Sequence, residues 1–188
     1  MGRIVVTEFV SLDGVMEDPG GSEDFKYGGW TFEITSGEKG GKFKLDETMA
    51  SDALLLGRVT YEGFAEAWPS REGEFADTFN RMPKYVVSST LQQADWENST
   101  VLRGDLAEEV AQLKAKHDGD VVVHGSAQLV QGLLEQDLVD ELRLMVFPVV
   151  LGDGKRLFGG TSDKKKVRLT DSKTVGDGVM ILVYEPVR

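Results

Sequence analysis

The sequence predicts a single α/β domain over residues 1–188, built on a mixed, mostly parallel sheet with helices on both faces and a C-terminal antiparallel hairpin. In the front part of the chain, strand-like runs that are apolar on both faces alternate with segments of helical period. After Asp137 the pattern changes to consecutive strands, and the last two are separated by the turn residues 176–178. Alternation favours a parallel sheet covered on both faces, and the terminal hairpin adds antiparallel strands at its edge.

The front half supplies the first alternating elements. Residues 3–11 (RIVVTEFVS) are rich in β-branched residues and end at the turn pair Asp13-Gly14, which predicts a first strand. A loop rich in glycine and acidic residues follows over 17–41. Pro69 ends a later helix because proline cannot continue it. The further elements expected here are strands at 53–57, 84–88 and 100–102, and helices at 42–51, 60–68 and 75–82.

In the rear half, strands and helices continue to alternate until three consecutive strands end the chain. Asp105 is a good N-cap for an amphipathic helix over 106–114. The run VVVHG at 121–125 predicts a buried strand, and apolar residues at helical spacing follow over 129–134. The last three strands are expected at 141–150, 167–175 and 179–185.

Composition and charge limit the classes of partner. The chain has 40% hydrophobic residues, no cysteine and a formal net charge of -11. An acidic surface repels nucleic acid and anionic lipid. The opening MGRIVVTEFV is too quickly charged for a signal peptide, and no apolar stretch reaches the roughly 18 residues of a membrane helix. We therefore expect a cytoplasmic protein that acts on a small molecule and binds neither nucleic acid nor membrane.

Three predicted strand ends carry residues suited to binding phosphate. Helix N-termini leave backbone N–H groups unpaired and carry partial positive charge, so phosphates bind there. Each motif alone is more often an ordinary strand-to-helix turn, and the hypothesis depends on finding three in one small domain. The motifs are LLLGRVT with Gly57, Arg58 and Thr60, VVSST with Ser88, Ser89 and Thr90, and VVVHGSAQL with Gly125, Ser126 and Ala127.

Other common site patterns are absent from the sequence. No G-x-G-x-x-G follows a strand, and GDGKRL at 152–157 lacks the spacing and the hydroxyl of a P-loop. With two histidines and no cysteine, no metal site is expected. His124 lies among apolar neighbours, which is more typical of a core or cofactor-side residue than of a catalytic base.

Four segments, taken in order after an opening strand that ends SLDG, resemble the dihydrofolate reductase-like superfamily. They are LLLGRVTYEGF, KYVVSST, VVVHGSAQLVQGLL and LVDELRLMVFPVVLGDGKRLF. The most similar branch is the reductase domain of the bifunctional riboflavin-pathway deaminase/reductase, with its stand-alone single-domain relatives. The resemblance covers nearly the whole chain, and its late block is the most specific part.

The resemblance implies NADPH bound across the strand ends. Gly57, Arg58 and Thr60 would meet its phosphates, and the hydroxyl residues 88–90 would lie near the adenosine 2′-phosphate. The other cofactor-binding residues that it implies are Gly125, Ser126, Ala127 and Gln128 at the pyrophosphate, and Phe9 and Val10 beside the nicotinamide. The family commonly has two or three glycines where this chain has Gly125-Ser126-Ala127.

Hydride transfer also needs a proton donor and a surface that positions the acceptor compound. Asp13, at the end of the first strand, is the leading candidate for a catalytic and substrate-binding group, and a turn-forming aspartate is the alternative. Trp30 and Phe32 are candidates for walling a flat heterocycle, although aromatic anchors under a long loop are more common. In folate enzymes a buried carboxylate on the first helix binds the pterin, but this role is not assigned to Asp46 or Glu47 here.

The sequence thus favours an NADPH-dependent reductase of a small heterocycle, most like 5-amino-6-(5-phosphoribosylamino)uracil reductase of riboflavin biosynthesis. A dihydrofolate-type reductase and a non-catalytic nucleotide-binding module are the alternatives. The chain carries no deaminase domain, which weakens a strict riboflavin-pathway assignment. The strand at 141–150 and the apolar terminal hairpin suit a homodimer, although an ordinary sheet core explains them equally well.

Overall fold

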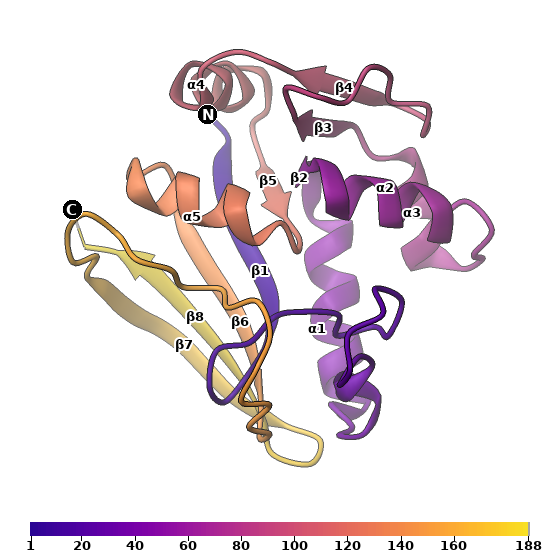
Figure 1. Ribbon diagram of the computed structural model, residues 1–188, viewed down its shortest axis with the longest axis vertical. Coiled ribbons are helices and arrows are strands. Elements are labelled where there is room, and N and C mark those ends of the chain that lie inside the picture. Colours follow the sequence, from indigo (N-terminus) through magenta and orange to yellow (C-terminus); the bar gives the residue numbers. More distant parts are fainter. Residues whose placement is uncertain (188) are drawn as a thin grey trace.

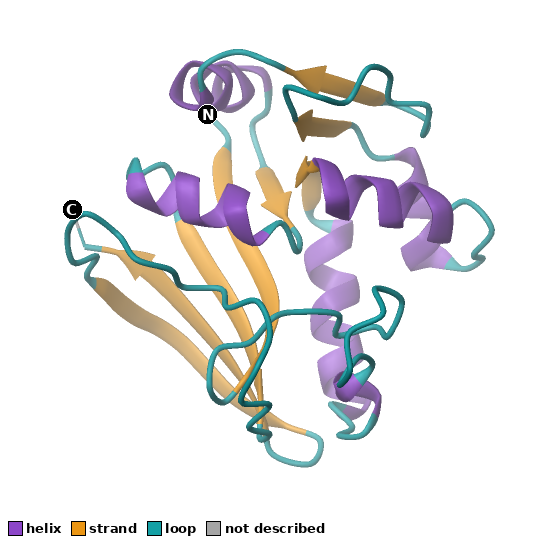
Figure 2. Cartoon of the chain, in the orientation of Figure 1, coloured by secondary structure: helices purple, strands orange, loops and turns teal. Residues whose placement is uncertain are grey.

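Eight strands form one sheet in the computed structural model, which describes residues 1–187 (Figures 1 and 2). Their order is β4-β3-β2-β5-β1-β6-β8-β7, and only β8 runs against its neighbours. The mostly parallel sheet with a C-terminal antiparallel hairpin is therefore confirmed. The strands are β1 (Arg3–Ser11), β2 (Ser51–Gly57), β3 (Lys84–Val87), β4 (Ser99–Leu102), β5 (Asp120–Val123), β6 (Glu141–Phe147), β7 (Val167–Val175) and β8 (Val179–Pro186).

Helices cover both faces of this sheet. On one face α4 and α5 pack on a core that includes Val6, Leu55 and Val123. On the other face α2 and α3 pack on Leu54 and Leu56, and α1 packs nearby on β6 and β8. The helices are α1 (Gly37–Met49), α2 (Arg58–Ala67), α3 (Glu74–Arg81), α4 (Leu106–Lys116) and α5 (Ala127–Glu135), with a short 3-10 helix η1 at Trp30–Phe32.

The alternation of β2 shows why its run from Ala53 to Leu56 is apolar at every position. Leu54 and Leu56 face the core beneath α2, whereas Leu55 faces the core beneath α5, because successive side chains of a strand point to opposite faces. The part of a central strand that is covered on both sides is therefore apolar on both faces.

Several element boundaries differ from those expected. α1 begins at Gly37 instead of residue 42, because the glycine-rich segment packs closely on the sheet: a Cβ on Gly40 would stand 3.4 Å from Cε of Met145. β6 ends at Phe147 instead of residue 150, since Pro148 has no N–H for the ladder. β5 stops at Val123, so His124 and Gly125 belong to the following turn.

A polar cluster lies between α1 and the sheet. Lys44 Nζ donates to Glu47 Oε2 at 2.6 Å and to Thr7 Oγ1 at 2.8 Å, and Arg143 lies 3.4 Å from Glu47 Oε1. Burial raises the pKa of Glu47, but Lys44 and the hydrogen bonds outweigh it, so the pKa is lowered overall. The buried carboxylate of α1 is thus Glu47, whereas Asp46 is exposed and pairs with Lys42.

No helix of residues 1–187 is both long and apolar enough to cross a membrane. In the same part of the chain, no group of three histidine or acidic residues is placed to hold a metal ion. Neither finding identifies a ligand. The geometry at the strand ends is more informative.

Candidate functional site

The sheet contains a gap beside the end of β1. β1 pairs with β5 only over residues 3–6, since β5 ends at Val123, and β1 then continues to Ser11 along β6. The N–H of Arg3 donates toward the β5 side and the carbonyl of Ile4 accepts from the β6 side. Strand alternation therefore directs the backbone N–H and C=O of Phe9 toward the side where β5 has ended.

The three expected phosphate-binding junctions meet at the same edge of the sheet. Gly57 N–H donates to Ser126 Oγ at 2.9 Å, and Ser126 N–H donates to Thr60 Oγ1 at 2.9 Å. The third junction is adjacent because Gly57 stands opposite Val87, the last residue of β3. The structure therefore brings together the residues that the sequence grouped as one site.

Two helix N-termini are open at this edge. α2 begins after Gly57 and α5 after Ser126, and neither has a side-chain cap, so first-turn N–H groups are left without a capping acceptor. α4 follows β4 at the same edge, but Asp105 accepts from the N–H groups of Ala107 and Glu108. The ends of α2 and α5 face each other across the middle of the molecule (Figure 1). Anions are therefore favoured between α2 and α5 rather than at α4.

The turn before α5 is held in an unusual backbone conformation. Gly125 and Ser126 have φ values of 55° and 61°. The Ser126 hydroxyl turns away from the helix end, accepting from Gly57 N–H and donating to the carbonyl of His124 at 3.1 Å. Ser126 therefore ties two junctions together and leaves the first turn of α5, at Ala127 and Gln128, uncapped.

The expected cation and hydroxyl groups lie around this edge and differ in their exposure and in the hydrogen bonds that they already make. Arg58 is 44% exposed and pairs with Glu62 at 2.9 Å. Ser88 Oγ accepts from the N–H groups of Thr90 and Leu91, so this hydroxyl is used in a local turn. Ser89 and Thr90 are exposed. Of the three hydroxyl residues, these two retain the exposure that a phosphate contact requires.

Asp13 does not have the geometry expected of a proton donor. Its carboxylate accepts from Ser11 Oγ at 2.6 Å and from the N–H groups of Leu151 and Gly152 at 3.1 and 2.9 Å. The Ser11 hydroxyl and these backbone donors lower the pKa of Asp13 to about 2, although burial opposes the shift. Asp13 thus joins the loop after β1 to the loop after β6, as the turn-forming alternative predicts.

Trp30 and Val10 are also placed more deeply than a ligand-binding role requires. Trp30 is 1% exposed, donates from Nε1 to the carbonyl of Glu17 at 2.8 Å and packs edge-on against Phe147. Val10 is buried in the core on the α5 side. Phe9 is only partly buried, so of the expected aromatic and nicotinamide-side residues it is the one that still borders the gap.

Several residues near the gap were not singled out by the sequence. Lys44 Nζ lies 5.4 Å from the centre of the Phe9 ring. Glu8 is buried beside Gly125, whose N–H it accepts at 3.0 Å. One signal was available for Glu8, because it is the only acidic residue within the otherwise strand-like run RIVVTEFVS. Lys44 has no such signal, since a lysine on a helix is ordinarily solvated.

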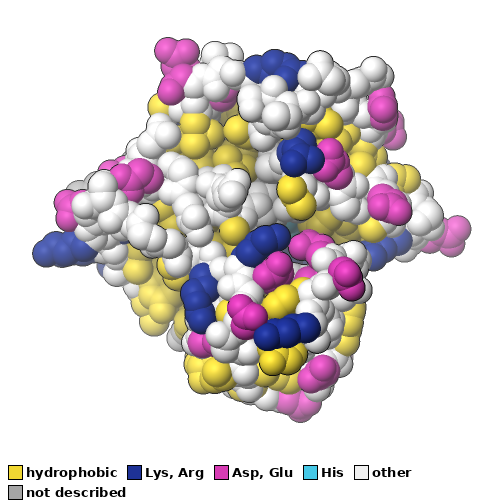
Figure 3. Space-filling view, in the orientation of Figure 1, with side chains coloured by type: hydrophobic (Ala, Val, Ile, Leu, Met, Phe, Trp, Pro, Cys, Tyr) yellow, Lys and Arg dark blue, Asp and Glu magenta, His cyan; other side chains and the backbone are white. Residues whose placement is uncertain are grey.

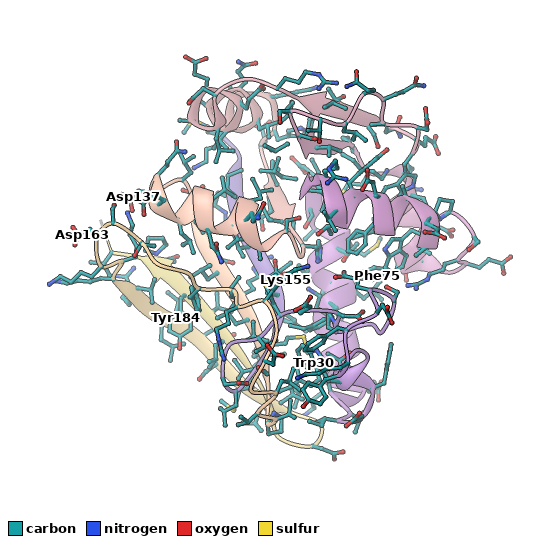
Figure 4. The ribbon with its side chains drawn as sticks, viewed as in Figure 1. Trp30, Phe75, Asp137, Lys155, Asp163 and Tyr184 are labelled. Atoms are coloured by element: carbon teal, nitrogen blue, oxygen red, sulfur yellow. The ribbon has the colours of Figure 1, made fainter. Side chains whose placement is uncertain are left out.

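The surface around the gap is mixed in charge. Figure 3 shows acidic and basic side chains side by side over the loops in the lower half of this face. Lys155 lies near the middle of the face (Figure 4), where its Nζ is 3.5 Å from Glu17 Oε1. Two hollows lie elsewhere, one of about 610 Å³ beside α2 and Trp96 and one of about 390 Å³ beside Tyr27 and Val150. We place the candidate site at the junctions because the open amides are there.

Comparison with known proteins agrees with this architecture. The chain is 29% identical over 187 residues to the uncharacterized protein YyaP of Bacillus subtilis, covering 97% of this chain and 94% of that protein. A putative riboflavin biosynthesis protein from Shewanella superposes with a TM-score of 0.78 at 23% identity, covering 99% of both chains. Acinetobacter baumannii RibD superposes with a TM-score of 0.68 at 17% identity, and the match covers 100% of this chain and 58% of that longer protein.

The match to a family model also covers nearly the whole chain. Residues 3–181 match the model of the RibD C-terminal domain, from the start of β1 into β8. The match includes the open ends of α2 and α5 and the gap beside β1. On the strength of this match, the chain belongs to the RibD C-terminal domain family.

Proposed function

We propose that this protein is an NADPH-dependent reductase of a small heterocycle, most like 5-amino-6-(5-phosphoribosylamino)uracil reductase. The observation that carries the proposal is the pair of uncapped helix N-termini, α2 and α5, facing one another beside the gap at β1. Membership of a reductase-type family supports the same reading. The junctions lie together on one edge of the sheet, as a single extended anionic ligand requires.

The residues present fit a dinucleotide phosphate. The first turn of α5, at Ala127 and Gln128, would hold the pyrophosphate with backbone N–H groups. Arg58, with Ser89 and Thr90, would hold the 2′-phosphate with a guanidinium and hydroxyls. The backbone of Phe9 would orient the nicotinamide in the gap. When bound, NADPH supplies a hydride to the acceptor.

The acceptor would lie on the α1 side of the gap, where Phe9 and Lys44 are placed. Lys44 Nζ has three N–H donors, and two are used by Thr7 and Glu47. The third would donate to the acceptor's oxygen or nitrogen and deliver the proton that accompanies hydride, after which Nζ regains a proton from solvent. Burial and Lys44 lower the pKa of His124 to about 3, so its imidazole remains neutral and does not add charge.

The most direct test is an NADPH-consumption screen with ribosylaminopyrimidinones, pteridines including dihydrofolate, and simple carbonyl compounds. We expect turnover with a ribosylaminopyrimidinone. Turnover with dihydrofolate instead would indicate the folate-type reductase. Tight NADPH binding without turnover of any acceptor would indicate a nucleotide-binding module, and absence of NADPH binding would contradict the proposal.

Arg58→Ala is expected to weaken NADPH binding about tenfold, because one charge-assisted contact to phosphate is lost. The measurement is a fluorescence titration of the protein with NADPH. Arg168→Ala is a matched control, since Arg168 also forms a single exposed ion pair, with Glu185 at 2.9 Å on the distant hairpin. Equal affinity in the wild type and in Arg58→Ala would remove Arg58 from the site.

We also propose a homodimer formed through the hairpin face. β7 is almost entirely exposed, and Leu169 on this strand is 48% exposed opposite Tyr184 of β8. Figure 4 shows Tyr184 on the hairpin, where its partly buried side chain also packs on the core of the α5 side. Sedimentation velocity is expected to give twice the 20.7 kDa chain mass, and Leu169→Glu to give the monomer. A monomeric wild type at micromolar concentration would overturn this arrangement.

A further inference from the structure

Glu8 carries a buried oxygen atom that lacks a partner. The residue is 6% exposed, and its Oε2 accepts a hydrogen bond from Gly125 N–H at 3.0 Å. Oε1 is buried and has no hydrogen-bond partner among residues 1–187. Buried polar atoms in native proteins are nearly always hydrogen-bonded. An orphaned carboxyl oxygen therefore points to a group that is supplied from outside the chain.

The position of Glu8 connects it to the open end of α5. Glu8 belongs to the part of β1 that extends beyond β5, and it stands opposite Leu144 of the α5-side core. Its partner Gly125 is two residues before Ala127, the first residue of α5, whose N-terminus has no side-chain cap. A ligand held at that N-terminus would thus lie next to the Glu8 carboxyl group.

Burial favours the neutral acid at this position. Burial raises the pKa of Glu8 well above its usual range, while the Gly125 amide and Lys44 act in the opposite direction and Glu47 adds to the rise. Lys44 and Glu47 of α1 lie on the other side of the sheet, beside Thr7, and act on Glu8 through space, whereas the Gly125 amide of the turn before α5 binds the Glu8 carboxyl group directly. Because Oε2 accepts from Gly125, the proton of the neutral acid resides on Oε1, which becomes a donor.

We propose that Glu8 is a proton-linked positioning residue for the cofactor: protonated, it holds the Gly125 amide and offers its O–H to the anionic bridge of the dinucleotide at the start of α5. This inference rests on the proposed function. An ionised Glu8 would place a negative charge beside the phosphates, so binding and protonation favour each other. Binding of NADPH above the ionisation range of Glu8 therefore takes one proton from solvent, which ends on Oε1.

Glu8→Gln distinguishes the neutral from the ionised state of the Glu8 carboxyl group, because it imitates only the neutral one. The amide keeps an acceptor for Gly125 and a donor in place of the O–H, and it cannot ionise. As the pH rises through the ionisation range of Glu8, which lies above that of an ordinary glutamate, we expect wild-type affinity for NADPH to fall at least tenfold relative to Glu8→Gln. Glu141→Gln is a matched control, because Glu141 is another buried acid but lies at the amino ends of the strands, paired with Arg3 and Arg143. This control should retain the wild-type pH profile.

Isothermal titration calorimetry of the full chain with NADPH gives an independent readout. In two buffers of different ionisation enthalpy, at a pH where wild-type affinity has begun to fall, the wild type should take up a proton that Glu8→Gln does not. This measurement on the wild type stands even if the variant fails to fold. NADPH binding with the same pH profile and no proton uptake would overturn the role of Glu8 alone, whereas no NADPH binding at any pH would overturn the proposed function as well.

Discussion

Gly125→Val is expected to weaken NADPH binding by about 10- to 100-fold, the equivalent of one hydrogen bond to a charged group. Gly125 has a φ of 55°, where a β-branched residue is strained. A Cβ at this position would stand 2.8 Å from Thr60 Oγ1, the atom that holds Ser126 N–H. The substitution therefore displaces the turn that aligns the first amides of α5.

Gly73→Val separates this effect from backbone strain. Gly73 also has a positive φ, of 107°, but a Cβ there would meet nothing within 4 Å, and it precedes α3 outside the site. Both variants should lose some thermal stability, and only Gly125→Val should lose NADPH affinity. A folded Gly125→Val that binds NADPH as tightly as the wild type would show that this turn does not hold the pyrophosphate.

Lys84→Met is expected to lower the free energy of unfolding by about 2–4 kcal/mol. Lys84 is fully buried at the start of β3. Its Nζ donates to the backbone carbonyls of Asn80, Met82 and Glu97 at 2.6, 2.8 and 2.9 Å and lies 4.3 Å from the Trp96 ring centre. Methionine fills similar space but leaves these carbonyls without a donor. Urea unfolding of both proteins at pH 7 measures the difference.

The same residue predicts a dependence of stability on pH. Burial lowers the pKa of Lys84 to about 8, against 10.5 as its ordinary value. Between these values the unfolded chain keeps a proton that the folded protein has released, so this group makes stability rise with pH. The difference in unfolding free energy between wild type and Lys84→Met should thus widen from pH 8 to pH 10. The surface variant Lys173→Met should show no such change, and a constant difference for Lys84→Met would contradict the assignment.

The fold was predictable wherever burial dictated the pattern. The runs ALLL and VVV are apolar at every position because both faces of a central strand are covered, and both lie in strands of the structure, β2 and β5. Boundaries set by tertiary contact were missed. The glycines at the start of α1 have low helix propensity, and the helix extends through them because it packs against β6.

The site was predictable where function uses small and polar residues after an apolar run. Gly57, Ser88 and Gly125 stand out in sequence for that reason, and the structure places their junctions side by side. Glu8 and Lys44 were missed because their environment depends on contacts between β1, α1 and the turn before α5. Asp13 was overvalued, since sequence does not show that its oxygens are occupied by loop donors.

The overhang of β1 beyond β5 has a consequence for how such proteins can diversify. Consecutive residues of one strand point to opposite layers, so Glu8 belongs to the wall near α5 and Phe9 to the wall near α1. Substitutions on the α1 wall would then change which acceptor compound fits, while the opposite wall keeps its contacts with the cofactor. A scaffold of this kind allows the cofactor-binding side to stay constant while the side that receives the acceptor changes.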